Sequence, residues 1–218
     1  MRPVTLTLFT VLVLAIGWPL PTQAASPWRL APDRPGPLAT VDDDPQACFA
    51  DLDRLGLRYA RVPDSRDARG CGVVDGVRFS ALPDGTRFSP ALTTTCALAR
   101  SLVRLESMVL QPAARALLGA PVVAAEHAGT FNCRSIRGSE RLSQHATANA
   151  VDLRSFTLST GQVIALRSDW QDGTAQGAFL TRVHRDACAL FRVVLGPDFD
   201  ANHRNHFHID NGVIRFCR

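Results

Sequence analysis

Three of the chain's six histidines lie near its carboxyl end, in the segment ANHRNHFHID at residues 201–210. They are His203, His206 and His208. On an extended chain side chains alternate between two faces, so His206, His208 and Asp210 would share one face of a strand. Imidazole nitrogens grouped in this way can bind a metal ion or transfer protons at neutral pH.

A second histidine-containing segment lies upstream, SQHATANAVD at residues 143–152. His145 leaves a polar loop, and Asp152 follows on a predicted strand after a run of small residues that lets the chain turn. Two histidines and one carboxylate drawn from these two segments would leave one open position on a tetrahedral zinc ion, as in catalytic sites. Zinc in such a site lowers the pKa of its water towards about 7 and polarises a carbonyl group.

Each of these residues also has a simpler interpretation. His145 alone could cap a turn, Asp152 alone could bind a turn amide, and the terminal histidines could form a solvated basic edge. The metal interpretation is favoured because four of the six histidines fall in two short segments with ligand-like spacing.

Other chemistries have weaker support in the sequence. Ser143 lies close to His145, but no GxSxG motif is present to make it a nucleophile. No phosphate-binding loop or dinucleotide fingerprint occurs. His127 and His184 are expected to be ordinary structural or surface histidines, and Trp170 could line a groove or anchor a loop.

The amino-terminal residues 1–24 are typical of a secretory signal peptide. Arg2 precedes the apolar run VTLTLFTVLVLAIGW, and small residues at Thr22 and Ala24 are typical of a cleavage site. An uncleaved anchor is the alternative. The expected location is therefore the periplasm or the exterior, with no stable membrane anchor after cleavage.

All six cysteines follow this segment, and an even number in an oxidising compartment predicts three disulfides. A zinc site made of cysteines is disfavoured because no CxxC pair occurs. The sequence leaves the pairing open, and pairing of neighbours is the simplest hypothesis. The neighbouring pairs are Cys48–Cys71, Cys96–Cys133 and Cys188–Cys217.

The chain's 218 residues suit one domain, with or without an appended lobe. Residues 25–47, rich in proline and acidic side chains, are predicted to form a loose leader. A small cysteine-bounded lobe is expected over 48–90, where turn signals are frequent, inside a domain that spans 48–218. The formal net charge of +4 is too small to indicate a nucleic-acid partner.

Apolar residues at helical spacing predict an amphipathic helix from Thr93 to Leu110, restarted at Pro112 and ended by Gly119. A second long helix is predicted over 174–195. Strands are predicted over 121–131, 148–158 and 206–212. This mixture indicates an α+β fold, with a mostly antiparallel sheet and flanking helices.

Within the strand predicted over 148–158, simple alternation puts Asp152, Arg154 and Phe156 on one face. Val151 and Leu153 would then lie on the opposite face.

The two histidine segments resemble motifs of a known superfamily. LSQHATANAVD resembles the SxHxxGxAxD motif of the LAS metallopeptidases, which include D-Ala-D-Ala carboxypeptidases, penicillin-insensitive murein endopeptidases and the hedgehog signalling domain. HRNHFH is similar to the HxxHxH motif of the murein endopeptidase branch. Ser143, His145, Ala150 and Asp152 match the first motif, and Ala148 replaces its usual glycine.

More broadly, residues 48–218 resemble the extensin-like carboxy-terminal family of bacterial secreted proteins. The segments CRS, RLSQHATANAVD and ACALFRVVLGPDFDANHRNHFHID and the terminal CR carry this resemblance.

The LAS resemblance implies a role for each matching residue. It implies a LAS or hedgehog-like zinc site with ligands at His145, Asp152 and His208. It also implies proton transfer or stabilisation of the tetrahedral intermediate by His206, with support from His203.

Two further positions carry expectations. Arg134 lies where relatives place a donor to the substrate carbonyl or carboxylate; its alternative role is structural, beside a disulfide. Asn205 stands where relatives carry the acid that serves as general base.

The resemblance therefore implies a secreted, zinc-dependent peptidase or amidase. Its substrate would be a peptidoglycan cross-link, or muropeptide, at a bond that involves a D-amino acid, and the enzyme is expected to be a monomer. The alternative is a catalytically weak or inactive zinc-containing module that binds the wall or regulates another protein. A disulfide-stapled envelope protein without metal is the third interpretation.

Overall fold

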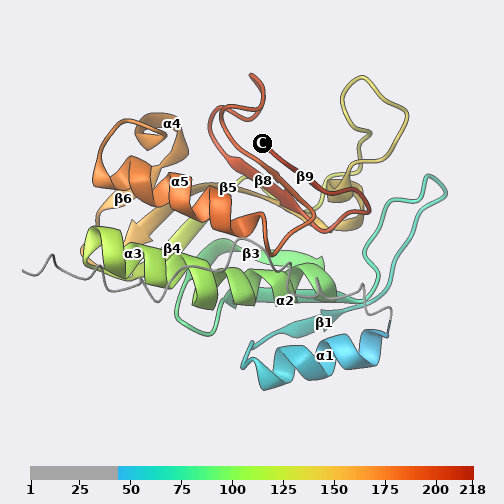
Figure 1. Ribbon diagram of the computed structural model, residues 1–218. Coiled ribbons are helices and arrows are strands. Elements are labelled where there is room, and N and C mark those ends of the chain that lie inside the picture. Colours follow the sequence, from blue (N-terminus) through green and yellow to red (C-terminus); the bar gives the residue numbers. More distant parts are fainter. Residues whose placement is uncertain (1–43) are drawn as a thin grey trace, which may run out of the picture. The chain divides into compact units, whose positions relative to one another are not determined.

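One sheet runs through the part of the chain that the computed structural model describes, residues 44–218 (Figure 1). The strand order within these residues is β1-β2-β3-β4-β5-β8-β7-β9, and β6 pairs with β5. The predicted signal peptide and the leader before residue 44 lie outside the described residues. The strands are β1 (Ala60–Val62), β2 (Gly76–Ala81), β3 (Arg87–Thr95), β4 (Val122–His127), β5 (Ala150–Leu158), β6 (Val163–Ala165), β7 (Val193–Leu195), β8 (Phe207–Asp210) and β9 (Phe216–Cys217).

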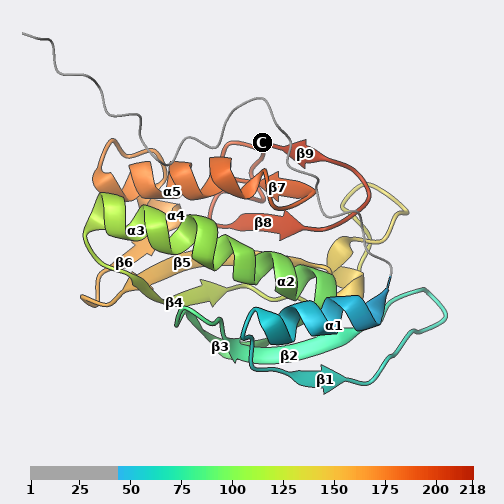
Figure 2. The ribbon, with the colours of Figure 1, turned by 60° about the horizontal axis from the view of Figure 1, so that its bottom comes forward.

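Most strand pairs are antiparallel, and only β3 with β4 and β7 with β9 are parallel among the described residues. Helices α2, α3 and α5 cover one face of the sheet in both views (Figures 1 and 2). The α+β prediction with a mostly antiparallel sheet is confirmed. The helices are α1 (Pro45–Arg54), α2 (Cys96–Leu105), the π-helical η1 (Glu106–Leu110), α3 (Gln111–Leu118), the 3₁₀ turn η2 (Gln144–Thr147), α4 (Leu166–Asp169) and α5 (Ala175–Ala187).

The helical run over α2, η1 and α3 is continuous from Cys96 to Leu118. Thr95 caps its start, because its Oγ accepts a hydrogen bond from the amide of Leu98 at 3.2 Å. Gly119 ends it with a left-handed φ of 70°, as predicted. The predicted start at Thr93 is wrong, because residues 93–95 pair with β2 as the end of β3.

The second long helix is shorter than predicted. Helix α5 ends at Ala187, and Val193 and Val194 instead form β7, which pairs with both β8 and β9. The apolar spacing fits a helix locally, but branched side chains with two strand neighbours are more stable in the sheet.

Strand β5 contains a bulge that changes which side chains face the core. In its pairing with β4, Glu126 lies opposite Ser155 and His127 opposite Leu153, so Arg154 has no opposite residue. Phe156 therefore lies on the helix-covered core face with Leu153, fully buried. The expectation that Phe156 shares the face of Asp152 is wrong because of this extra residue.

The core lies between the sheet and the helices. Phe156 of β5 and Phe179 of α5 pack edge to face with ring centroids 5.7 Å apart. Elsewhere on the helical side, Glu106 of η1 is buried. Its carboxylate accepts hydrogen bonds from the amides of Asp84 and Thr86, each at 2.8 Å. These bonds fix the turn of the β2–β3 hairpin against the helices.

Two of the three predicted disulfides are wrong. Cys48 pairs with Cys96 and Cys71 pairs with Cys133, so the predicted Cys48–Cys71 and Cys96–Cys133 bonds do not form. Pairing neighbouring cysteines assumed that each short segment closes on itself. In the structure α1 packs beside α2, which brings Cys48 to Cys96. The loop before β2 lies against the loop after β4, which brings Cys71 to Cys133. The third prediction, Cys188–Cys217, is confirmed and joins the end of α5 to β9.

The lobe predicted over 48–90 is part of the main fold. Strands β1 and β2 and the start of β3 extend the same sheet, and helix α1 already begins at Pro45, inside the predicted leader. Within residues 44–218, no helix combines the length and hydropathy needed to cross a bilayer.

Candidate metal centre

Neighbouring strands place Asp152 and His208 side by side. In the antiparallel pair of β5 and β8, these two residues lie directly opposite each other. Val151 and Ile209, the next pair along, are fully buried on the core face, so Asp152 and His208 project from the other face of the sheet. The hydrophobic pattern therefore fixes the register that brings the two side chains together.

A short turn brings His145 to the same place. The Oγ of Ser143 caps η2 by accepting a hydrogen bond from the amide of His145 at 3.3 Å. Ala148 then takes a left-handed conformation with φ 54°, which reverses the chain into β5. Glycine adopts this conformation without cost, so Ala148 stands at a position where the backbone favours glycine.

Three donor atoms converge at this point. Nε2 of His145 lies 3.2 Å from Oδ1 of Asp152 and 3.1 Å from Nδ1 of His208. Nδ1 of His208 lies 3.0 Å from the same Asp152 oxygen. The structure thus brings together His145, Asp152 and His208, called the triad below, as a group that could hold a metal ion.

The outer nitrogen of each triad histidine has its own acceptor. Nδ1 of His145 lies 3.1 Å from the backbone oxygen of Thr130, and Nε2 of His208 lies 3.0 Å from Oδ2 of Asp210. A backbone carbonyl can only accept, so Nδ1 of His145 carries its proton. In both rings the inner nitrogen therefore faces the carboxylate, in the orientation that a metal ligand needs.

The electrostatics of the triad favour a positive charge among these atoms. Burial raises the pKa of Asp152, but hydrogen bonds from His145 and His208 outweigh it and hold that pKa well below its usual range. Burial lowers the pKa of His208, but hydrogen bonds to Asp152 and Asp210 raise it to about 9. A proton or a metal ion placed among these atoms would be stabilised by the same two nitrogens and carboxylate oxygen.

His206 and His203 lie beside the triad. Nε2 of His206 is 3.6 Å from Oδ1 of Asp152, and its Nδ1 is 2.9 Å from the side-chain oxygen of Asn205. Burial lowers the pKa of His206, and the charge of Asp152 only partly offsets this. The ring of His203 lies 5.2 Å from that of His206.

The part of the chain that carries these residues matches a known sequence family. Residues 46–218 match the sequence profile of the family described as extensin-like protein C-terminus. The chain belongs to this family. No curated protein and no solved structure matches the chain.

In this extensin-like chain, Arg134 forms no hydrogen bond or ion pair with the triad within residues 44–218. Its side chain is exposed, and its guanidinium donates a hydrogen bond to the backbone oxygen of Ser135 at 3.5 Å. Arg154 is the arginine near the site instead. It follows Asp152 by two residues on β5, and its charge contributes to the lowered pKa of His206.

Sequence reasoning assigned no role to Asp210 or Arg154. The signal was present for both: Asp210 shares the strand face of His208, and Arg154 was placed on the face of Asp152. Their roles became apparent only from the contacts that each makes.

Two other groups of metal-type side chains contain disulfide-bonded cysteines. They are His184 with Cys188 and Cys217, and Asp67 with Cys71 and Cys133. Because each sulfur is already bonded to another sulfur, neither group offers a thiolate ligand. The triad is therefore the candidate metal centre among the described residues.

Proposed function

We propose that the triad binds a zinc ion, and that this extensin-like chain is a secreted peptidase or amidase acting on the peptide cross-links of peptidoglycan. The bond cleaved would involve a D-amino acid. The observation that carries the proposal is the convergence of Nε2 of His145, Nδ1 of His208 and Oδ1 of Asp152 within about hydrogen-bond distance of one another.

The donor set fits zinc. Imidazole nitrogen and carboxylate oxygen are both common zinc ligands, and three protein ligands leave a fourth tetrahedral position open for substrate or water. The carbonyl of Thr130 and the carboxylate of Asp210 hold the outer nitrogens, which is how histidine ligands are oriented in metal sites. Zinc supplies Lewis-acid activation of water and of the amide carbonyl when bound.

Proton transfer falls to His206. With its Nδ1 hydrogen donated to Asn205, Nε2 carries the lone pair and lies 3.6 Å from Oδ1 of Asp152. The depressed pKa of His206 keeps this nitrogen free to accept a proton at neutral pH. Asn205 cannot accept a proton itself, so it acts here by orienting the histidine.

The substrate class rests on resemblance and on location. The two motifs resemble those of LAS peptidases that act on peptidoglycan. Three disulfides suit an oxidising compartment such as the bacterial envelope, where that polymer lies. A binding or regulatory module with bound metal but no turnover is the second candidate, and Asn205 in place of an acid is the observation that favours it.

Two measurements test the proposal. Zinc per chain is measured by mass spectrometry in the wild type and in His208→Ala, His206→Ala and the control Arg115→Ala, at an exposed position on α3. We expect about one zinc in all but His208→Ala. Cross-linked muropeptides are then incubated with each protein, and His206→Ala should lose at least about a hundredfold in turnover while it keeps its zinc.

The outcomes separate the candidates. Wild-type protein without zinc would overturn the metal centre. Zinc without cleavage of any cross-link would replace the peptidase with the binding module. Unchanged turnover in His206→Ala would remove that histidine from the chemistry.

A further inference from the structure

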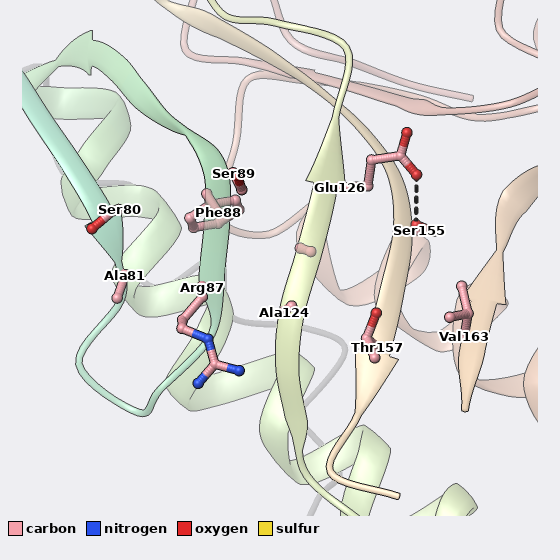
Figure 3. Close-up of a pocket in the computed structure, with 11 residues that line it drawn as sticks. Ser80, Ala81, Arg87, Phe88, Ser89, Ala124, Glu126, Ser155, Thr157 and Val163 are labelled. Atoms are coloured by element: carbon pink, nitrogen blue, oxygen red, sulfur yellow. Dashed lines mark hydrogen bonds between the residues drawn. The ribbon is translucent and has the colours of Figure 1, made fainter. Parts of the chain in front are cut away.

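A groove lies on the face of the sheet that carries Asp152, away from helices α2 and α3. It has a volume of about 500 Å³ and is formed by strands β2 to β6 (Figure 3). Its lining includes Arg87, Ser89, Ala124, Glu126, Ser155 and Thr157. Ala124 of β4 and Ser155 and Thr157 of β5 have short side chains. The charged side chains in the lining are Arg87 on β3 and Glu126 at the other end of β4.

The end of the groove that contains Glu126 and Ser155 lies beside the segment of β5 that carries Asp152. Arg154, two residues beyond Asp152, has its Nη1 3.8 Å from Oε1 of Glu126. The other oxygen of Glu126 accepts a hydrogen bond from Ser155 at 3.1 Å. The backbone oxygen of Asp152 accepts a hydrogen bond from Ala128 just beyond β4, so the ends of β4 and the triad are adjacent.

The charges along the groove leave one cation unbalanced. Glu126 is paired with Arg154 near the triad. Arg87 lies further away, is exposed, and forms no ion pair with any residue between 44 and 218. An anionic group on a ligand would therefore be attracted to Arg87, and a guanidinium binds a carboxylate through two parallel hydrogen bonds.

The spacing between Arg87 and the triad sets the length of the ligand. Arg87 lies opposite Ala124, and Ala124 lies opposite Thr157, five positions along β5 from Asp152. At about 3.3 Å per residue, five positions correspond to about 16 Å along β5. An extended peptide of about five residues spans the same distance.

We propose that the groove binds the substrate peptide in an extended conformation, and that Arg87 binds a carboxylate four to five residues from the scissile bond. The inference rests on the proposed function, because it places the scissile bond at the triad. It makes the chain selective for long, acidic stem peptides over dipeptides.

The test compares two cross-linked muropeptides that differ only in one group, a free or an amidated carboxylate at the far end of the stem. We measure kcat/KM for each with the wild type, Arg87→Gln and the control Arg115→Gln. Arg115 is exposed on α3, on the helix-covered side of the sheet, so the control removes the same charge away from the groove. We expect the wild type and the control to prefer the free acid by about tenfold, and Arg87→Gln to lose that preference.

Equal cleavage of both muropeptides by the wild type would overturn the groove assignment and leave the peptidase intact. If neither is cleaved, the proposed function fails, and equilibrium binding of the free and amidated stem pentapeptides decides the inference on its own. Tighter binding of the acid, abolished in Arg87→Gln only, would support the groove as a ligand site. Equal binding would overturn it.

Discussion

Asp210 determines how the ring of His208 is oriented. Its Oδ2 lies 3.0 Å from Nε2 of His208, and its Oδ1 accepts a hydrogen bond from the amide of Gly212 at 2.7 Å. The carboxylate is buried and held by the chain turn that follows β8. With Nε2 engaged in this way, Nδ1 is the nitrogen that faces Asp152.

Replacing this carboxylate should weaken metal binding without removing a ligand. In Asp210→Asn, one of the two bonded oxygens becomes an amide nitrogen that faces a donor, so the ring loses part of its support. We expect the zinc affinity, measured by competition with a chelator, to fall by about tenfold to a hundredfold. Asp186→Asn, the same change on α5, is the control and should keep wild-type affinity. Equal affinities in the two variants would contradict the orienting role.

On helix α5, the half-buried His184 contacts the strand that carries His208. His184 packs against the ring of Phe207, the neighbour of His208, at a centroid distance of 5.4 Å. Its Nε2 donates a hydrogen bond to the backbone oxygen of Arg218 at 3.1 Å. Gly196 passes so close that a Cβ there would lie 3.0 Å from the His184 ring. Of the two expected roles, structural or surface, these contacts favour the structural one.

This packing makes stability depend on pH in a defined direction. Burial lowers the pKa of His184, although its bond to Arg218 and the charge of Asp198 partly offset this. The stability contributed by the neutral ring is thus complete above the unfolded-state pKa of about 6.5, and is lost as the pH falls below it towards the folded-state pKa.

We therefore expect the wild type's free energy of unfolding in urea to fall more steeply between about pH 7 and about pH 5 than that of His184→Gln. The excess slope is at most about 1.4 kcal/mol per pH unit for one histidine. Arg185→Gln, an exposed neighbour, should keep the wild-type slope. Parallel pH profiles for the wild type and His184→Gln would show that the ring is equally protonated in both states.

At the scale of the whole molecule, the disulfides join segments that lie far apart in the sequence. Cys71–Cys133 is close to the triad, because both segments it joins contact η2. The amide of Gly72 donates to the oxygen of Ala146 at 2.9 Å, and the amide of Asn132 donates to the oxygen of His145 at 3.0 Å. The disulfide therefore braces the turn that presents His145.

Removing this bond should reduce both stability and metal affinity. In Cys71→Ser with Cys133→Ser, the closed loop of 62 residues is released, which costs about 4 kcal/mol in the free energy of unfolding. Zinc affinity should fall as well, because η2 loses its brace. Both are measured by urea denaturation and chelator competition.

The matched control is Cys188→Ser with Cys217→Ser. Its loop spans 29 residues, so we expect a similar loss of about 3.5 kcal/mol. Zinc affinity should change less, since this disulfide joins α5 to β9 away from η2. A larger loss of zinc in the control would contradict the bracing role of Cys71–Cys133.

The sequence by itself determined most of the element types and the residue types that meet at the triad. Helical spacing with a glycine cap located the run that ends at Gly119, and alternation with flanking turns located β5 and β8. The donor residues His145, Asp152 and His208 were identifiable because each lies within a short segment whose spacing has chemical meaning. Propensity, capping and alternation act over a few residues, so a single sequence carries them.

Only the tertiary structure decided which segments meet. Several features depend on partners that are distant in the chain. They are the disulfide pairs, the bulge at Arg154, the strand at residues 193–195 where a helix was predicted, and the position of Arg87 in the groove. A strand's free energy depends on the neighbour with which it pairs, and a disulfide forms only where two Cα atoms come within about 7 Å. Those neighbours are set by the whole sheet, which brings Asp152 opposite His208 although 56 residues separate them.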